Sequence, residues 1–369
     1  MALREKALAT ADRPLLIAII MLCSVSVLAL YSASGEDPAL LARHGMRAGI
    51  AIVLMLLVAR IPPSVLAHWS PYVYGFGMLL LVVVLAVGVV GKGAQRWLDL
   101  YLLRFQPAEM MKLAVPMMIA WLLTRVSLPP RAAISALAAL AALVPAALVM
   151  LQPDLGTAIL ILLAGIIVIF LAGLGWKSIA AVLTAVLAAT PALWTFVLHD
   201  YQRRRIVTLL DPWADPLGAG YHTIQSIIAV GSGGFEGKGW LASTQARLDF
   251  IPERATDFVF AVYAEEFGFI GAVALLLLYL FATCRGLMIS FYAHDTYSRL
   301  LGGCLSLLFF LHAFVNIGMA IGLLPVVGVP LPLISYGGTS MVTLMIAFGI
   351  LMSIHRNRKI LPRHGQHAI

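Results

Sequence analysis

Apolar residues occur along this chain in long runs that few charged residues interrupt. Ten of these runs are long enough to cross a hydrocarbon core about 30 Å thick as α-helices rising about 1.5 Å per residue. They lie at about 14–33, 44–60, 72–91, 107–125, 132–150, 155–173, 176–198, 258–284, 299–323 and 334–354. The pattern predicts an all-α, polytopic membrane protein with about ten transmembrane helices in a single domain, residues 1–369.

Composition and charge agree with this pattern and add an orientation. The chain is 62% hydrophobic and 11% charged, with a mean hydropathy of +0.97, which excludes the soluble class. Ten spans put both termini on one side, which carries 13 basic and 3 acidic residues, against 12 and 14 on the other. The positive-inside rule makes the basic side the cytoplasm. We therefore attribute the net charge of +8 to topology and predict no nucleic-acid partner.

Motifs for disulfides and organic cofactors are missing from the sequence. Cys23, Cys284 and Cys304 lie inside or at the ends of predicted spans, so we expect no disulfide and no cysteine metal site. Neither GxGxxG nor GxxxxGK followed by Ser or Thr occurs, so we expect no organic cofactor.

Two loops on the outer, extracytoplasmic side are long. One covers residues 92–106, and the other, residues 199–257, joins the seventh and eighth spans. Long ordered loops are usually functional, and this second loop holds most of the unusual polar chemistry of the chain. Its segment 222–231 has apolar residues at helical spacing and predicts an amphipathic helix on the membrane surface.

The segment 105-FQPAEMMKLAVP-116 places two opposite charges just inside the bilayer. Pro107 suits the first position of a helix, and Glu109 lies in the first turn, where the helix dipole favours an anion. Lys112 follows three residues later and shares a face with Glu109. The pair either faces a polar cavity or is a structural ion pair that fixes helix packing.

Further carboxylates lie at the outer membrane boundary. Asp154 in 152-QPDLGTAI-159 either caps the sixth span or lines a cavity. Thr256 and Asp257 begin the eighth span, where capping alone would explain both. Glu265 and Glu266 lie about 12–13 Å further along that helix, where acids are costly unless they are paired or functional.

The connection 324-LPVVGVPLPLISYGGTS-340 contains three prolines and three glycines and breaks the helix repeatedly. Non-helical backbone at membrane depth is tolerated only where protein or a polar cavity shelters it. We therefore predict that this segment is re-entrant or broken and lines a functional site. Arg43, Arg47 and Arg104 lie near the same boundary. A pocket of carboxylates and cations set in lipid suits a lipid-linked diphosphate, although the residues alone leave a transporter nearly as consistent.

Several motifs, in order across nearly the whole chain, resemble the SEDS family (shape, elongation, division and sporulation). They are KGAQRWLDL, RFQPAEMMK, LQPDLGTAIL, DPLGAGYHTIQSIIAVGSGG, GKGW, IPERATDFVFAVYAEEFG and PVVGVPLPLISYGGTS. The wording around the shared motifs is more similar to the elongation-type (RodA) members than to the division-type (FtsW) members.

The resemblance implies a peptidoglycan glycosyltransferase that polymerises lipid II on the periplasmic face of the bacterial inner membrane. It also implies membrane lipids and a class B penicillin-binding protein, a transpeptidase, as partners. Asp257 matches the essential aspartate of the family, and Glu109 and Lys112 match its FQPSExxK motif. Ala108 stands where the family usually has Ser, and Ala255 where many RodA sequences have His, so no role is assigned to either position.

The chemistry expected from this resemblance is an inverting transfer, which needs one base and no covalent enzyme intermediate. Asp257 is the expected catalytic residue, either as that base or as a ligand of a divalent cation, Mg²⁺ or Mn²⁺. The residues expected to bind substrate are Arg43, Arg104, Gln106, Glu109, Lys112, Asp154 and Ser335. The alternatives are a lipid II flippase, a division-type polymerase and a non-catalytic scaffold.

Overall fold

The structure is a computed structural model that describes residues 12–91, 94–99, 104–175, 200–218, 220–248, 250–251 and 253–358, with isolated positions at 180, 184, 188 and 195. Seven described helices are long and apolar enough to cross a membrane: α2 (Arg13–Ala33), α3 (Pro38–Val58), α4 (Pro63–Val87), α6 (Ala132–Met150), α12 (Val259–Phe291), α13 (Thr296–Ala320) and α14 (Gly338–Arg356). Helices α5 (Pro107–Leu123) and α7 (Leu155–Leu171) have 17 residues each. The chain is therefore a mostly helical, multi-pass membrane protein. The predicted span 176–198 lies outside the described residues, apart from the four isolated positions.

Aspartate caps set the starts of several helices. Asp12 accepts a hydrogen bond from Leu15 N at the start of α2, and Asp37 accepts one from Ala39 N at the start of α3. Each carboxylate satisfies a backbone N–H that the first turn of a helix leaves without an internal partner. This explains why α3 begins at residue 38 rather than at the predicted 44.

Helix α4 begins at Pro63 rather than at about 72, and the difference has a physical reason. Ser70 and Pro71 interrupt the apolar run in the sequence, yet both lie within the helix. The Ser70 hydroxyl is paired with the Tyr297 hydroxyl at 2.9 Å, so its polarity is satisfied inside the bundle.

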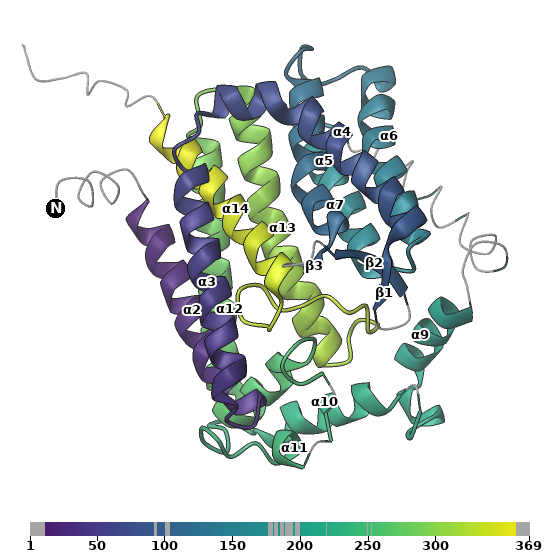
Figure 1. Ribbon diagram of the computed structural model, residues 1–369, viewed down its shortest axis with the longest axis vertical. Helices are drawn as coiled ribbons and strands as arrows, with labels where there is room; N and C mark the ends of the chain where they lie inside the picture. The colour runs from purple at the N-terminus through teal and green to yellow at the C-terminus, as the bar shows by residue number, and fades with distance from the viewer. Residues whose placement is uncertain are drawn as a thin grey trace, which may run out of the picture.

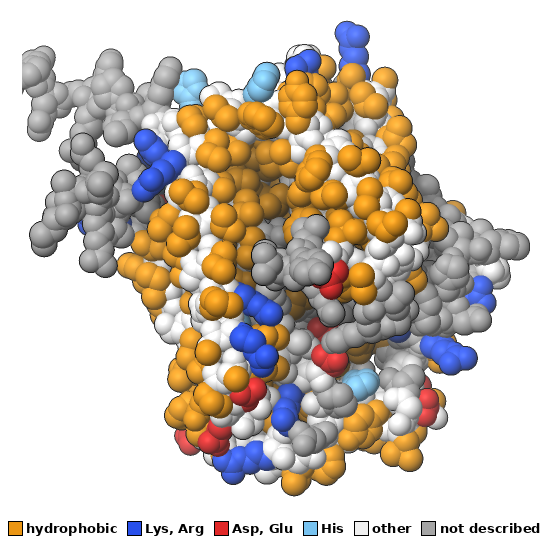
Figure 2. All heavy atoms as spheres, in the orientation of Figure 1, with side chains coloured by type: hydrophobic (Ala, Val, Ile, Leu, Met, Phe, Trp, Pro, Cys, Tyr) orange, Lys and Arg blue, Asp and Glu red, His pale blue; other side chains and the backbone are white. Residues whose placement is uncertain are grey.

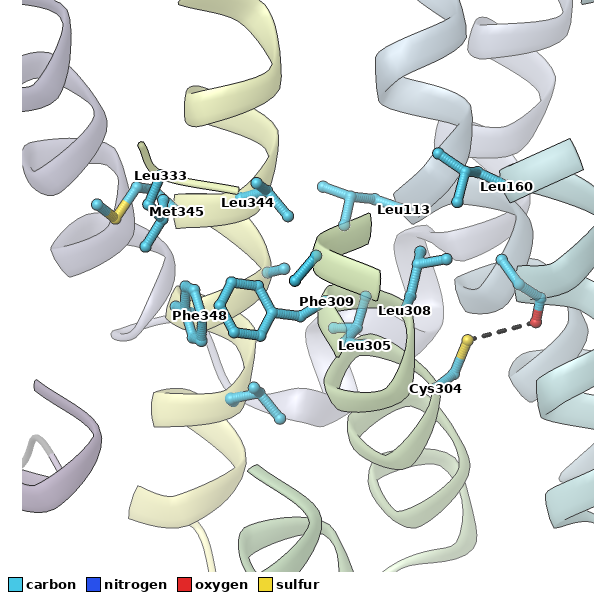
Figure 3. Close-up of a cluster of buried hydrophobic side chains, with 14 of the residues drawn as sticks. Leu113, Leu160, Cys304, Leu305, Leu308, Phe309, Leu333, Leu344, Met345 and Phe348 are labelled. Atoms are coloured by element: carbon cyan, nitrogen blue, oxygen red, sulfur yellow. Dashed lines mark hydrogen bonds between the residues drawn. The ribbon is translucent and has the colours of Figure 1, made fainter. Parts of the chain in front are cut away.

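Helix α13 runs through the middle of the bundle and organises it (Figure 1). It packs against α12 and α14 on one side and α5 and α7 on the other. Phe309 of α13 lies between Tyr279 of α12 and Phe348 of α14, with ring centroids 5.5 and 4.9 Å apart. Figure 3 shows Phe309 and Phe348 in this core, which continues to Leu113 of α5 and Leu160 of α7.

Small residues bring neighbouring helices together. A Cβ on Gly165 of α7 would lie 2.3 Å from the Ala142 Cβ of α6, and one on Gly349 of α14 would lie 2.6 Å from the Met55 carbonyl oxygen of α3. Lipid gives no hydrophobic force between helices, so such close backbone packing is a main source of association in membranes.

The loop predicted at 92–106 forms part of a small antiparallel sheet with strand order β1-β2-β3. The strands are β1 (Val89–Gly91), β2 (Ala94–Asp99) and β3 (Arg104–Phe105), and Leu98 pairs with Phe105. Arg96 of β2 donates hydrogen bonds to the carbonyls of Gln152 and Pro153, which ties the sheet to the connection before α7.

The loop predicted at 199–257 contains α9 (Asp200–Leu210), the 3₁₀ turn η2 (Pro212–Ala214), α10 (Tyr221–Ser232) and α11 (Thr244–Arg247). The helix expected at 222–231 is confirmed as α10. It packs against α12 and α13, and Ser226 donates a 2.6 Å hydrogen bond to the Ala320 carbonyl at the end of α13.

Helix α12 is broken at Gly268, where φ is 63° and ψ is −160°. The glycine-rich segment of the outer loop docks at this break, because Lys238 N and Gly239 N donate to the carbonyls of Glu265 and Glu266 at 3.0 Å each. The span expected at about 258–284 is therefore two helical segments joined at Gly268 rather than one continuous helix. The glycines of 231–240 thus have a structural role, because they allow the outer-loop backbone to approach the backbone of α12 closely.

Polar and apolar side chains are separated along the length of the bundle. Figure 2 shows hydrophobic side chains over the middle of one face, whereas Asp and Glu gather with Lys and Arg in its lower half. In Figure 1 this lower half holds α10, α11 and the loop between α13 and α14. On this face the acidic side chains therefore lie toward one end of the helices.

Candidate active site

The broken segment, residues 324–337 between α13 and α14, is irregular backbone as predicted. Protein groups hold it in place: the Tyr279 hydroxyl donates to the Pro332 carbonyl at 2.6 Å, and Ser26 donates to the Ile334 carbonyl at 2.9 Å. Helices α12 and α2 supply these donors. The segment is thus sheltered by the bundle, as non-helical backbone in a membrane protein requires.

Asp257 lies half-buried just before α12 and faces this broken segment. Its Oδ2 atom lies 3.6 Å from the position that a Cβ would take on Gly328. The N-cap residue of α12 is Phe258, one position after Asp257. The Thr256 hydroxyl bonds to Glu253, 2.8 Å from Oε2.

Ser335 holds the backbone next to Asp257. Its hydroxyl donates to the Thr256 carbonyl and accepts from Leu331 N at 2.8 Å, and the side chain is buried. The neighbouring Tyr336 N donates to the Ala255 carbonyl at 2.8 Å. Ser335, expected to bind substrate, thus has its hydroxyl engaged by two backbone groups in this structure.

Glu109 and Lys112 form the predicted same-face pair at the start of α5, with Lys112 Nζ 2.7 Å from Glu109 Oε1 and both side chains buried. Sequence reasoning missed His312 of α13, whose Nε2 lies 3.1 Å from the same Nζ. His312 Nδ1 lies 2.8 Å from the Leu308 carbonyl, so Nδ1 carries the proton and Nε2 accepts from the ammonium. The sequence did contain a signal for His312, because a polar residue inside the predicted span 299–323 is a candidate functional residue.

The surroundings of this pair are apolar. A small pocket beside Lys112 and His312 is lined by side chains such as Leu113, Leu305 and Thr343. Among the described residues the Glu109 Oε2 atom is buried and has no hydrogen-bond partner. A charged pair in such a setting costs free energy unless its ions are well paired, which is typical of functional positions in membranes.

Gln106 and Asp154 join the starts of α5 and α7. Gln106 Nε2 donates to Asp154 Oδ2 at 2.8 Å, and Asp154 caps α7 by accepting from Thr157 N at 3.2 Å. The capping interpretation of Asp154 is confirmed. Gly156, beside it, packs so closely on the broken segment that a Cβ would lie 2.6 Å from the Val327 carbonyl oxygen.

The predicted cations are placed unequally. Arg43 is exposed on α3, and the side chain of Arg104 lies outside the described part of the chain. Arg47, one turn after Arg43, stacks over the Tyr336 ring with its Cζ 4.7 Å from the centroid. His44 is buried on the same helix, 2.9 Å from Ser26 Oγ. Of the two α3 arginines, Arg47 is the one that the structure brings to the broken segment.

Glu265 and Glu266 are paired, and they serve as anchors of the outer loop. Glu265 is fully buried and accepts hydrogen bonds from Lys238 Nζ at 2.6 Å and Thr244 N at 3.1 Å. Glu266 accepts one from Ser32 at the end of α2. Their partners come from the outer loop and α2, so the pairing interpretation holds.

Several of the candidate groups therefore lie around one segment. Val327 lies against the start of α7, Gly328 against the Asp257 carboxylate, and the Val329 carbonyl against Asn316 of α13. His312, which contacts Lys112, lies one helical turn from Asn316, or about 6 Å along the axis. A carboxylate, a buried cation and an arginine thus lie at the same end of the bundle, an arrangement able to bind a phosphate and accept a proton.

Comparisons with known proteins agree with the residue motifs. The FTSW_RODA_SPOVE family model of cell cycle proteins matches residues 6–360. Peptidoglycan glycosyltransferase MrdB of Escherichia coli K12 is 50% identical over 352 residues, 95% of each chain.

Two solved structures have the same fold. Rod shape determining protein RodA of Thermus thermophilus has a TM-score of 0.72 and 30% identity, with 94% of this chain and 97% of that one covered. A chain from a peptidoglycan synthase complex that coordinates polymerization and crosslinking has a TM-score of 0.83 and 35% identity, with 94% and 98% covered. This chain therefore belongs to the FtsW/RodA/SpoVE family of cell cycle proteins, which is the SEDS family, as a RodA-type member.

Proposed function

We propose that this chain, a peptidoglycan glycosyltransferase of the RodA type, polymerises lipid II with Asp257 at the reacting centre. The activity is supported by the curated relative that is 50% identical over 95% of both chains. The role of Asp257 is carried by one observation: its carboxylate lies against Gly328 in the broken segment.

In the proposed reaction the sugar hydroxyl of the acceptor attacks the anomeric carbon of the donor. The bond from that carbon to the α-linked diphosphate breaks, and the new glycosidic bond is β, so a single base opposite the leaving group suffices. Asp257 accepts the hydroxyl proton as the new bond forms. Undecaprenyl diphosphate departs with the bonding electron pair, and the cationic groups Arg47 and Lys112 stabilise its negative charge.

A divalent cation, Mg²⁺ or Mn²⁺, is a second proposed role for Asp257. Among the described residues no three His, Cys, Asp or Glu side chains converge, so the protein would supply at most two such side chains here. That fits Mg²⁺, which commonly binds one or two carboxylates together with substrate phosphates and water. The cation would neutralise the charge that develops on the diphosphate.

The proposed topology has ten spans within one domain, both termini in the cytoplasm and the active site on the periplasmic face of the inner membrane. The seven long helices, the two 17-residue helices and the span predicted at 176–198 make up this number. Asp12 before α2 lies 3.4 Å from His355 near the end of α14, so the two ends of the described chain meet. The broken segment precedes α14 and therefore lies at the opposite end, away from the basic side.

The proposed partner is a class B penicillin-binding protein, a transpeptidase. This is supported by the likeness to a chain from a complex that coordinates polymerization and crosslinking. Lipid II and the surrounding membrane lipids are the other proposed partners. Helices α3 and α4 expose most of their apolar surface, which suits contact with lipid.

The test is polymerisation of labelled lipid II by the purified protein in proteoliposomes. Asp257→Asn is expected to fold and insert but to make no glycan, because the amide is neither a base nor a good cation ligand. Glu253→Gln is the matched control: it lies on the same loop, is exposed, and keeps an acceptor for Thr256. Chelation with and without added Mg²⁺ or Mn²⁺ separates the base role from the cation role. Normal polymerisation by Asp257→Asn would contradict the assignment.

A further inference from the structure

Helix α13 presents two buried polar side chains toward the candidate site. His312 and Asn316 are 1% and 0% exposed, and their spacing of four residues places them on one face of the helix. His312 contacts Lys112, as described above. Asn316 contacts the backbone on either side of the Asp257 carboxylate, a contact that the reaction proposed above does not use.

The Asn316 amide bridges two segments that are distant in sequence. Its Nδ2 donates to the Asp257 carbonyl at 2.8 Å and to the Val329 carbonyl at 2.7 Å. The opposite orientation would set Oδ1 against two carbonyl oxygens, so the hydrogen bonds define the amide orientation. The two N–H groups of one side chain therefore hold the two backbone segments, at Asp257 and at Val329, between which the Asp257 carboxylate meets Gly328. These two segments are called the walls below.

Two further hydrogen bonds join the same two segments at neighbouring residues. Ser335 and Tyr336 N bind the carbonyls of Thr256 and Ala255, and both come from the broken segment itself. Asn316 alone among these three belongs to a long helix of the bundle. It therefore ties the loop that carries Asp257 to the same rigid element that holds Lys112 through His312.

We propose that Asn316 is a positioning residue that sets the Asp257 carboxylate relative to the Lys112 ammonium. The inference rests on the role of Asp257 proposed above. Loss of the Asn316 donors would release the Asp257 backbone and the Val329 carbonyl, and the wall at Gly328 would move with them. A misplacement of about 1 Å in a catalytic group lowers the rate by about 10²-fold.

A purely structural role makes a different prediction. Among the described residues the Asn316 Oδ1 atom is buried without a hydrogen-bond partner, an arrangement that costs free energy. An asparagine kept only for stability would affect the folded fraction and the melting temperature. A positioning asparagine affects turnover per folded molecule and leaves substrate affinity nearly unchanged.

The experiment measures kcat and KM for lipid II with Asn316→Leu, which removes both donors at similar volume. Ser306→Ala is the control, because its hydroxyl is also buried on α13 but bonds to Gly302 within the same helix. For Asn316→Leu we expect kcat per folded molecule to fall by about 10²-fold, and KM to change by less than about threefold, as a loss confined to the transition state requires. Ser306→Ala should keep kcat near that of the parent protein.

The double variant Asn316→Leu, Ser335→Ala provides a second measurement, and a purely structural role of Asn316 predicts no particular kcat for it. Both side chains hold the same short stretch, so the double variant should lose about as much kcat as the worse single variant. Losses that multiply, or a kcat for Asn316→Leu equal to that of Ser306→Ala, overturn the inference. If Asn316→Leu does not fold, Asn316→Ala decides by the same kcat reading, since it removes both donors without adding volume. Failure of both to fold assigns Asn316 to stability alone and also overturns it.

Asp257→Asn, assayed in parallel, separates this inference from the proposed function. If Asp257→Asn polymerises normally, the proposed role of Asp257 fails, whatever Asn316→Leu does. If Asp257→Asn is inactive and Asn316→Leu behaves like Ser306→Ala, only the positioning role fails.

Discussion

Gly328 is the residue against which the Asp257 carboxylate lies, and its backbone has a φ of 73°. Gly328→Ala would hold a methyl group 3.6 Å from Asp257 Oδ2, an ordinary contact, in a conformation that costs an L-residue about 1–2 kcal/mol. Gly173→Ala at φ 96° carries similar strain far from the site, beside Pro129. We expect both variants to lose similar stability. Only Gly328→Ala should lower lipid II polymerisation, by about tenfold for one misplaced contact. Equal polymerisation activities of the two variants would show that Gly328 is needed only for the local backbone conformation.

At the same scale, the sequence was sufficient for some residues and not for others. Glu109 and Lys112 are three apart on one helix, so their pairing follows from helix geometry. Arg43 and Arg47 lie four residues apart on one face of α3, so spacing alone could not predict that Arg47 is the one that stacks over Tyr336. His312 and Asn316 escaped because their partners lie on other elements, which sequence spacing cannot connect.

At the scale of elements, the dock between the glycine-rich outer loop and the break in α12 can be tested with two neighbouring glycines. Gly237 and Gly239 have φ of 86° and 100°, so alanine strains both backbones by about 1–2 kcal/mol. A Cβ on Gly237 would lie 2.1 Å from the Glu266 carbonyl oxygen, whereas one on Gly239 meets nothing within 4 Å. Gly237→Ala should cost about 1–3 kcal/mol more than Gly239→Ala, the usual range for overpacking.

Thermal unfolding and limited proteolysis of the outer loop measure this difference. The loop of Gly237→Ala should be cut faster, because the backbone hydrogen bonds of Lys238 and Gly239 to α12 would open. Identical cleavage of both variants would mean that the loop is held by side chains such as Glu265 instead. The apolar runs predicted the helices themselves, but the break at Gly268 could not be predicted, since a single glycine within an apolar run is common in membrane helices.

At the scale of the whole molecule, one ion pair joins the beginning, the middle and the end of the described chain. Asp12 before α2 is buried and accepts from Arg285 of α12, with Nε–Oδ1 and NH2–Oδ2 distances of 2.9 and 2.5 Å, and His355 of α14 lies 3.4 Å away. Burial raises the pKa of Asp12, but the hydrogen bonds from Arg285 and Leu15 N outweigh it, so the pKa lies below the usual 3.8. A folded-state pKa below the unfolded value means that this contribution to stability is present above pH 3.8 and is lost as the pH falls through the folded pKa.

Arg285→Gln tests this clasp between the helices. Above about pH 5 the variant should be less stable than the parent protein by about 3 kcal/mol, because a buried carboxylate loses its main partner. As the pH falls below 3.8 the parent protein should lose this advantage, and the two melting temperatures should converge. Arg131→Gln, at an exposed position before α6, should follow the parent protein at every pH. A gap for Arg285→Gln that stays constant down to the acid limit would show that the Arg285 side chain contributes by packing, and that the charge of Asp12 does not couple the ends of the chain.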